Sequence, residues 1–174
     1  MNTLIIHGSR YGTTKRYAEK FAEITHFPII SYEDVKNLAD YERIIYFGAL
    51  YAGGIKGLKN TVKKLSSNTK LIIVTVGLAD VCDQENISNI RNSLRKQVPE
   101  HLSKAASVFH LRGGIDYSKL NFKHKTMMKM VYHSLKSKPT ESLTQEDKAF
   151  IETYNKKVDF VDYDSLKQIV EATK

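Results

Sequence analysis

A group of hydroxyl-bearing residues around one glycine is the part of this chain best suited to bind an anion. The group is Ser9, Arg10, Tyr11, Gly12, Thr13 and Thr14. It follows the apolar run Leu4-Ile5-Ile6 and precedes residues with helical periodicity, which predicts a strand–turn–helix junction. Such a junction directs backbone N–H groups and hydroxyls to one point at the positive end of a helix dipole. A phosphate monoester suits that geometry, although Thr13 or Thr14 could equally serve as an ordinary N-cap.

Two other phosphate-binding patterns do not fit the sequence. A Walker loop needs lysine and a hydroxyl residue after its second glycine, but Gly54 and Ile55 follow Gly53 here. A dinucleotide fingerprint needs three closely spaced glycines after the first strand, whereas this turn has Gly8 and Gly12 with hydroxyl residues around them. The pattern therefore favours one terminal phosphate over a pyrophosphate.

The elements that must position this loop alternate between strand and helix. We expect strands at Thr3–His7, Phe27–Ser31, Arg43–Ala49, Lys70–Val76 and Ala105–Leu111. We expect helices at Thr14–Thr25, Leu58–Leu65, Asn86–Lys96 and Ser165–Ala172, a short helix or turn within Tyr32–Tyr41, and loops at Gly48–Gly57 and Gly77–Asp83. Near-continuous apolar strands indicate burial on both faces. The sequence thus predicts an α/β fold with a doubly wound, five-stranded parallel sheet, in a single domain over 1–174.

One segment exceeds what a minimal five-stranded fold needs. About fifty residues separate the fifth strand from the last helix, where a loop of roughly 2–6 residues would suffice. Within them one helical face would carry Leu120, Met127, Met128, Val131 and Leu135, and the opposite face Lys125, Lys129 and Lys136. We therefore predict an insert at about 113–160 that contains a basic amphipathic helix. It would lie beside the carboxyl end of the fifth strand, where ligands bind in open α/β sheets.

The charge of the chain is concentrated in this insert. The net charge is +8, and Ser118 to Lys138 hold six lysines and no acidic residue. The segment Lys119–Lys138 can be a solvated face, or it can contact an anionic membrane as a helix that lies on the lipid surface. No apolar run is long enough to span a bilayer, the start of the chain has no leader pattern, and Cys82 is the single cysteine. We expect a cytoplasmic protein that can lie peripherally at the inner face of the membrane. The histidine spacing indicates no metal site, and no residue is identified as catalytic.

The hydroxyl-rich loop resembles the phosphate loop of the flavodoxin family. Ser9-x-Tyr11-Gly12-x-Thr14 is similar to that family's hydroxyl-x-hydroxyl-Gly-x-hydroxyl loop, which binds the phosphate of FMN. The resemblance implies FMN as the cofactor and the strand order 2-1-3-4-5. It also implies two flavin-ring loops, at Ala49, Leu50, Tyr51, Ala52 and Gly53 and at Thr75, Val76, Gly77, Leu78 and Ala79. Tyr51 would stack on the isoalloxazine ring.

A narrower resemblance begins at the fifth strand. Arg112-Gly113-Gly114-Ile115-Asp116-Tyr117, with Met127–Met130 and Asp162-Tyr163, is similar to the flavodoxin-type, menaquinone-dependent protoporphyrinogen dehydrogenases. That subfamily often has arginine where Asp116 stands, and its insert is richer in arginine and aromatic residues. The resemblance implies oxidation of a porphyrinogen with a quinone or other redox partner. The predicted substrate or membrane surface comprises Gly114, Tyr117, Lys123, Lys125, Met127, Met128 and Lys129.

The sequence is compatible with three functions. The first is an FMN-dependent oxidoreductase that accepts electrons from a substrate, with the basic insert favouring the anionic reduced flavin. The second is a soluble electron-transfer flavodoxin. The third is a partner- or nucleic-acid-binding module without flavin. Its basic segment lacks the aromatic interleaving of single-strand binders, so no specific nucleic acid is expected.

Overall fold

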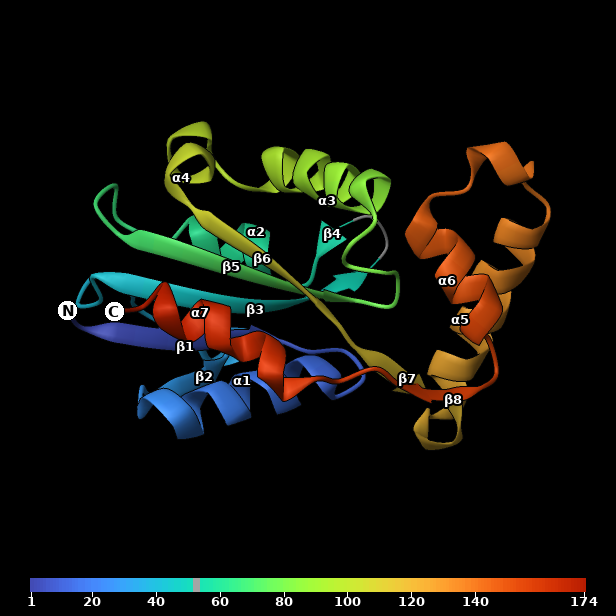
Figure 1. Cartoon of the computed structure of the whole chain (residues 1–174), viewed down its shortest axis with the longest axis horizontal. Coiled ribbons are helices and arrows are strands. Elements are labelled where there is room, and N and C mark those ends of the chain that lie inside the picture. The colour runs from blue at the N-terminus through green and yellow to red at the C-terminus, as the bar shows by residue number, and fades with distance from the viewer. Residues whose placement is uncertain (52–53) are drawn as a thin grey trace.

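A central parallel sheet organises the chain (Figure 1). The computed structural model describes residues 1–51 and 54–174. The parallel strands are β1 (Thr3–Gly8), β2 (Ile29–Ser31), β3 (Arg43–Tyr51), β5 (Lys70–Gly77) and β6 (Ser107–Arg112). Their order is β2-β1-β3-β5-β6, with register pairs such as Ile5↔Ile45 and Ile45↔Ile72. The predicted α/β fold with strand order 2-1-3-4-5 is confirmed.

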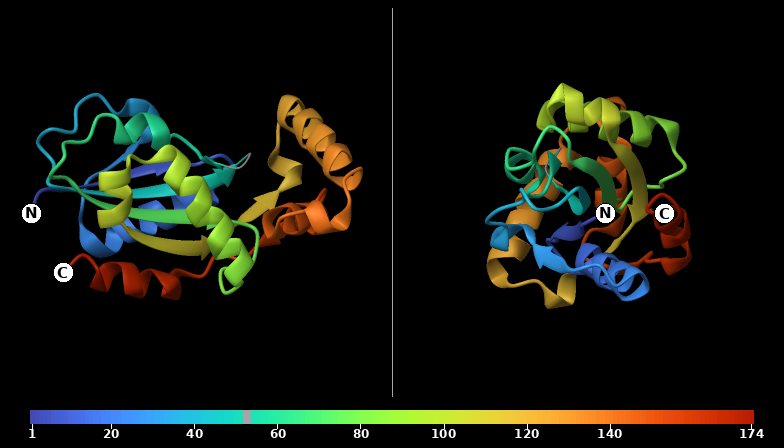
Figure 2. Two further views of the ribbon diagram at one scale, coloured as in Figure 1. Left: turned by 90° about the horizontal axis from the view of Figure 1, so that it is seen from above. Right: turned by 90° about the vertical axis from the view of Figure 1, so that its left-hand side faces the viewer.

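Helices cover both faces of the sheet (Figures 1 and 2). On one face, α1 (Thr13–Thr25) and α7 (Lys167–Glu171) bury Tyr17, Phe21 and Ile169 against the strands. On the other, α2 (Leu58–Val62), α3 (Gln84–Gln97) and α4 (Glu100–Ala105) bury their own apolar side chains, among them Leu58, Ile90, Leu94 and Leu102. The inner strands are therefore buried on both faces, which explains why their sequences are near-continuous apolar runs.

The insert stands at the end of the sheet where the parallel strands terminate, opposite both chain termini (Figure 2). Its base is a two-stranded antiparallel sheet of β7 (Gly114–Asp116) and β8 (Lys157–Asp159), with Ile115 opposite Val158. Along the chain, the helices α5 (Phe122–Lys136) and α6 (Gln145–Thr153) connect β7 to β8. A third apolar cluster, with buried Ile115, Tyr117 and Met128 at its centre, joins the insert to the loops above the sheet. Single 3-10 turns occur at Tyr32–Asp34, Tyr117–Lys119, Thr140–Ser142 and Tyr163–Leu166.

The structure departs from the predicted elements in several places. The expected loop at Gly48–Gly57 is partly strand, because β3 continues to Tyr51 and β4 (Gly54–Ile55) pairs antiparallel with it. The backbone N–H of Ile55 also donates to Gln97 Oε1 at 2.9 Å, which fixes β4 on α3. Helix α2 ends three residues early, before the turn-forming Ser66-Ser67-Asn68. Helices α4 and α6 were not predicted, and the last helix is split into a 3-10 turn and α7.

None of the helices in the described ranges is long and apolar enough to cross a membrane. Helix α5 is the longest, with fifteen residues, and it carries lysines along its length.

Candidate functional site: a cavity between the sheet and the insert

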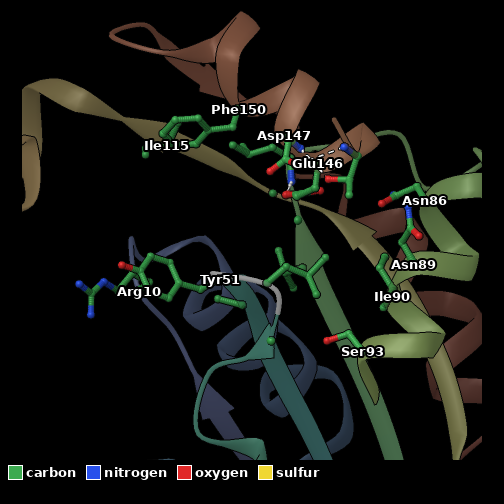
Figure 3. Close-up of a pocket in the computed structure, with 18 of the residues that line it drawn as sticks. Arg10, Tyr51, Asn86, Asn89, Ile90, Ser93, Ile115, Glu146, Asp147 and Phe150 are labelled. Carbon is green, nitrogen blue, oxygen red and sulfur yellow. Dashed lines mark hydrogen bonds between the residues drawn. The ribbon is translucent and has the colours of Figure 1, made fainter. Parts of the chain in front are cut away.

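A cavity of about 620 Å³ lies between the carboxyl end of the sheet and the insert (Figure 3). This volume falls within the range of roughly 300–1,000 Å³ that small-molecule and cofactor sites occupy. Its walls come from the loop after β1 and the start of α1, from the ends of β3 and β5 and the residue that follows β5, from β4 and α3, and from the insert. Among the predicted site residues, those that line it are Arg10, Tyr11, Thr13, Thr14, Ala49, Leu50, Tyr51, Val76, Gly77, Leu78, Gly114 and Met128. Residues from all three predicted cofactor loops therefore meet in one cavity.

The loop Ser9–Thr14 forms a tight turn that leaves the start of α1 uncapped by side chains. Ser9 Oγ accepts a hydrogen bond from the Gly12 N–H at 3.1 Å. Gly12 has φ 95°, in the left-handed region that favours glycine, and no side chain of the described residues caps α1. Thr13 Oγ1 donates instead to the Gly114 carbonyl at 3.4 Å. Gly12 is the N-cap residue of α1, so the alternative that Thr13 or Thr14 is an ordinary N-cap is wrong. First-turn amides without a side-chain cap are the feature by which helix N-termini bind anions.

Three residues connect this loop to the insert. The Arg10 guanidinium carbon lies 4.9 Å from the centre of the Tyr51 ring, and Arg10 Nη2 lies 3.8 Å from Met127 Sδ. The Tyr51 hydroxyl donates to the same sulfur at 2.9 Å. Arg10 Nε is buried and has no hydrogen-bond partner within the described part of the chain. A buried donor of this kind is costly unless an acceptor reaches it, which makes Arg10 a second feature suited to an anion.

The loop after β5 is held by a residue that sequence reasoning missed. Glu146, at the start of α6, accepts hydrogen bonds from the Leu78 N–H at 2.7 Å and from the Ala79 N–H at 3.0 Å. Arg112 Nε donates to the Leu78 carbonyl at 2.9 Å from the other side. Burial raises the pKa of Glu146, against the lowering effect of the two amide bonds and of Arg112. The capping-box pattern Thr144-x-x-Asp147 could have located α6, but no sequence signal connects Glu146 with this loop.

Several predicted residues lie outside the cavity lining. Thr75 is buried, and its hydroxyl lies 2.7 Å from His110 Nδ1. Ala79 is buried and reaches the site only through its amide. Tyr117 is buried within the insert, where its ring meets Tyr154 edge-on at 5.4 Å, and burial raises its pKa. The predicted positions Ala52 and Gly53 lie outside the described residues.

The lysines of the insert face outward. Lys123, Lys125 and Lys129 are exposed, whereas Met128 and Leu135 turn inward and line the cavity. The charged side chains that line it among the described residues are Arg10, Lys96, Glu146 and Asp147, which balance in sign. The lysines of α5 therefore lie outside the lining of the cavity. No group of three or more His, Cys, Asp or Glu side chains in the described residues could hold a metal ion.

Comparison with known proteins identifies the family. A family model described as a flavodoxin domain matches residues 4–142. A flavoprotein from Lactobacillus acidophilus, solved in complex with FMN, is 14% identical, covering 64% of this chain and 91% of its own, with a TM-score of 0.43. A flavodoxin variant from Pseudomonas aeruginosa is 16% identical, covering 75% of this chain and 93% of its own, with a TM-score of 0.40. Neither likeness bears on what this chain binds, and none of the curated proteins matches it. Because the family model matches most of its length, the chain belongs to the flavodoxin domain family.

Proposed function

We propose that the cavity binds FMN and that the protein is an FMN-dependent oxidoreductase, which oxidises a substrate such as protoporphyrinogen and passes the electrons to a quinone. FMN is the cofactor that membership in the flavodoxin domain family implies. The residues present fit that group. The cavity has the volume of a cofactor site, α1 begins without a side-chain cap, and Arg10 brings a buried unpartnered donor from the described loop.

Each wall of the cavity has a distinct task in this proposal. Arg10, Tyr11, Thr13 and Thr14 of the loop Ser9–Thr14 line the cavity, whereas Ser9 and Gly12 do not. The amides and hydroxyls of this loop would hold the phosphate, and Tyr51 would offer an aromatic face to the ring. A side chain at Gly77 or Gly113 would collide with neighbours, since a Cβ there lies 2.7 Å from Leu50 Cδ1 or from Val76 Cγ1 respectively. The backbone therefore approaches its neighbours closely on this side. Bound flavin supplies reversible acceptance of one or two electrons, and the protein binds, orients and shields it.

The apolar wall contributed by the insert carries the enzyme proposal. Ile115, Met128, Val131, Leu135 and Phe150 line the cavity from β7, α5 and α6. An electron carrier needs only one exposed edge of its flavin. A wall of apolar side chains continuous with the cofactor loops provides, in addition, a surface for a flat apolar substrate.

Porphyrin formation tests this proposal. The FMN-loaded protein is mixed with protoporphyrinogen and a menaquinone analogue, and porphyrin fluorescence is followed. We expect a rate well above autoxidation. Met128→Ala removes a buried side chain of the cavity wall and should lower the rate, whereas Met130→Ala, at a position 63% exposed on the same helix, should not. No fluorescence above the autoxidation rate refutes the assignment.

A soluble electron-transfer flavodoxin is the second candidate, and the two carboxylates in the lining favour it. Glu146 and Asp147, adjacent on α6, would oppose an anionic reduced flavin and lower its potential, whereas Arg10 and Lys96 would act in the opposite direction. The two flavin midpoint potentials separate the candidates. A strongly negative hydroquinone couple, with reductase-driven cycling and no porphyrin, supports the carrier. A protein that stays colourless after FMN addition supports the module without flavin.

We also propose that the outer face of α5 meets an anionic membrane surface. Phe122 is 85% exposed and Met130 63% exposed, among the exposed Lys123, Lys125 and Lys129. Exposed apolar side chains flanked by lysines suit the headgroup region of anionic lipid. Co-sedimentation with phosphatidylglycerol vesicles, but not with phosphatidylcholine vesicles, is expected. The double variant Phe122→Ser/Met130→Ser should lose it, and Ile24→Ser, a 45% exposed position on α1, should keep it. Equal binding by both variants contradicts the assignment to α5.

A further inference from the structure

The insert sends one carboxylate into the cofactor cavity, where it binds two successive backbone amides (Figure 3). We propose that Glu146 is a positioning residue for the cofactor: it fixes the Leu78–Ala79 amides at the cavity wall and makes flavin affinity depend on its own charge. The inference rests on the proposed binding of FMN. The family match ends at residue 142, so α6 and Glu146 lie beyond the matched segment.

The geometry of Glu146 is that of a clamp. Each carboxylate oxygen accepts from a different amide, at 2.7 Å from Leu78 N and 3.0 Å from Ala79 N. Hydrogen bonds to an ionised acceptor are roughly twice as strong as bonds between neutral groups. A Cβ at Gly77 would lie 2.9 Å from Glu146 Oε2, so the carboxylate also packs against the end of β5. The loop that is predicted to meet the flavin ring is therefore fastened to the insert.

Glu146 itself is held in place by α6 and its neighbours. The capping box between Thr144 and Asp147 fixes the first turn of α6, with Asp147 N 3.1 Å from Thr144 Oγ1 and Thr144 N 3.0 Å from Asp147 Oδ2. The adjacent Gln145 Nε2 donates to Glu85 Oε2 on α3 at 3.0 Å. The capping box and the bond to α3 thus restrict the rotation of α6. Because Glu146 is held in this way, its carboxylate couples the position of the insert to that of the Leu78–Ala79 loop.

The charge of Glu146 depends on the groups around it. Arg112 on β6 and Asp147 on α6 act on it most directly, Glu85 on α3 bonds its neighbour, and Arg10 and Lys96 line the same cavity. Because burial raises its pKa, Glu146 takes up a proton at a higher pH than an exposed carboxyl does. Protonation places an O–H against an amide donor and removes one of the two bonds. The clamp therefore loosens as the pH falls toward that raised pKa.

Flavin titration tests the clamp. FMN is added to flavin-stripped protein, and its affinity is read from the quenching of flavin fluorescence at pH 7.5 and at pH 5. Glu146→Gln keeps the size of the side chain but turns an NH₂ group toward one amide donor. We expect about tenfold weaker binding at pH 7.5, the equivalent of about 1.4 kcal/mol. The loss of affinity between the two pH values should be smaller for Glu146→Gln than for the wild type.

The control is Glu152→Gln, which removes the same charge from an exposed position of the same helix and should bind like the wild type at both pH values. Glu146→Gln binding as tightly as the wild type, or more tightly, overturns the inference. So does a lowered melting temperature of the flavin-stripped variant with unchanged affinity, because that result assigns Glu146 to folding alone. A wild-type protein that quenches no FMN contradicts the proposed function itself, and the two failures are thereby distinguishable.

Discussion

Replacing Tyr17 with phenylalanine should weaken the joint between the sheet and the insert. Tyr17 on α1 is 1% exposed. Its hydroxyl donates to the Arg112 carbonyl at 2.8 Å and accepts from the Asp162 N–H at 2.8 Å. Burial raises the pKa of the phenol, so the hydroxyl stays protonated at neutral pH. One side chain thus joins α1 to the strand that leads into the insert and to the segment that returns from it.

The expected magnitude follows from the two partners left behind. A buried polar group that loses its hydrogen bond costs about 1–3 kcal/mol, so two fully buried groups would cost about 2–6 kcal/mol in the free energy of unfolding. Because Arg112 is half-buried and Asp162 is exposed, water solvates the freed groups in part, and we expect the lower part of that range, about 2–4 kcal/mol. With a urea slope of about 2 kcal/mol/M, the unfolding midpoint should fall by about 1–2 M. Phenylalanine fills the same volume, so no cavity contributes to this value.

Urea unfolding followed by circular dichroism measures the effect. Tyr41→Phe is the matched control, because that tyrosine is only half-buried and lies before β3 at the opposite end of the sheet. It should change the unfolding free energy by less than about 0.5 kcal/mol. A Tyr17→Phe change that is equally small would refute the reasoning, since the two backbone groups would then have other partners.

Three further predictions concern the cavity and its surroundings. Gly12→Ala places a side chain at φ 95° and should cost about 1 kcal/mol or more, with weaker FMN binding in fluorescence titration. Gly113→Ala brings a Cβ to 2.7 Å from Val76 Cγ1, and calorimetry should show a loss of about 1–3 kcal/mol in stability. Burial lowers the pKa of His110, so unfolding free energy should decline as the pH falls below about 6.5, and His110→Gln should flatten that decline in urea unfolding.

Much of the sheet could be predicted because its determinants are local. Buried parallel strands read as apolar runs, and the turn after β1 combines a glycine with φ 95° and hydroxyl residues. The convergence of the three cofactor loops then follows from topology, since parallel strands end at the same edge of the sheet.

The remaining features depend on contacts that no local pattern shows. Helix α6 has only nine residues and few apolar ones, so its periodicity does not predict a helix despite its capping box. Glu146 reaches Leu78 over 68 positions of sequence, and an isolated glutamate gives no sign of such a partner. The periodicity of α5 predicts its lysines on one face. Which face of α5 meets the cavity depends on how β7 and β8 orient the whole insert, and the sequence of α5 does not contain that information.

The position of α7 has a consequence for the order in which the protein forms during synthesis. Leu166 and Ile169 are 1% and 0% exposed within the cluster that covers β1, β3 and β5. That face of the sheet is covered by α1 alone until the ribosome has made the insert and α7. At about 5–20 residues per second, the roughly fifty residues between β6 and α7 take some 3–10 s. Throughout this interval the apolar side chains that Leu166 and Ile169 cover stay exposed, so we expect the nascent flavodoxin domain to be most prone to aggregation just before α7 docks.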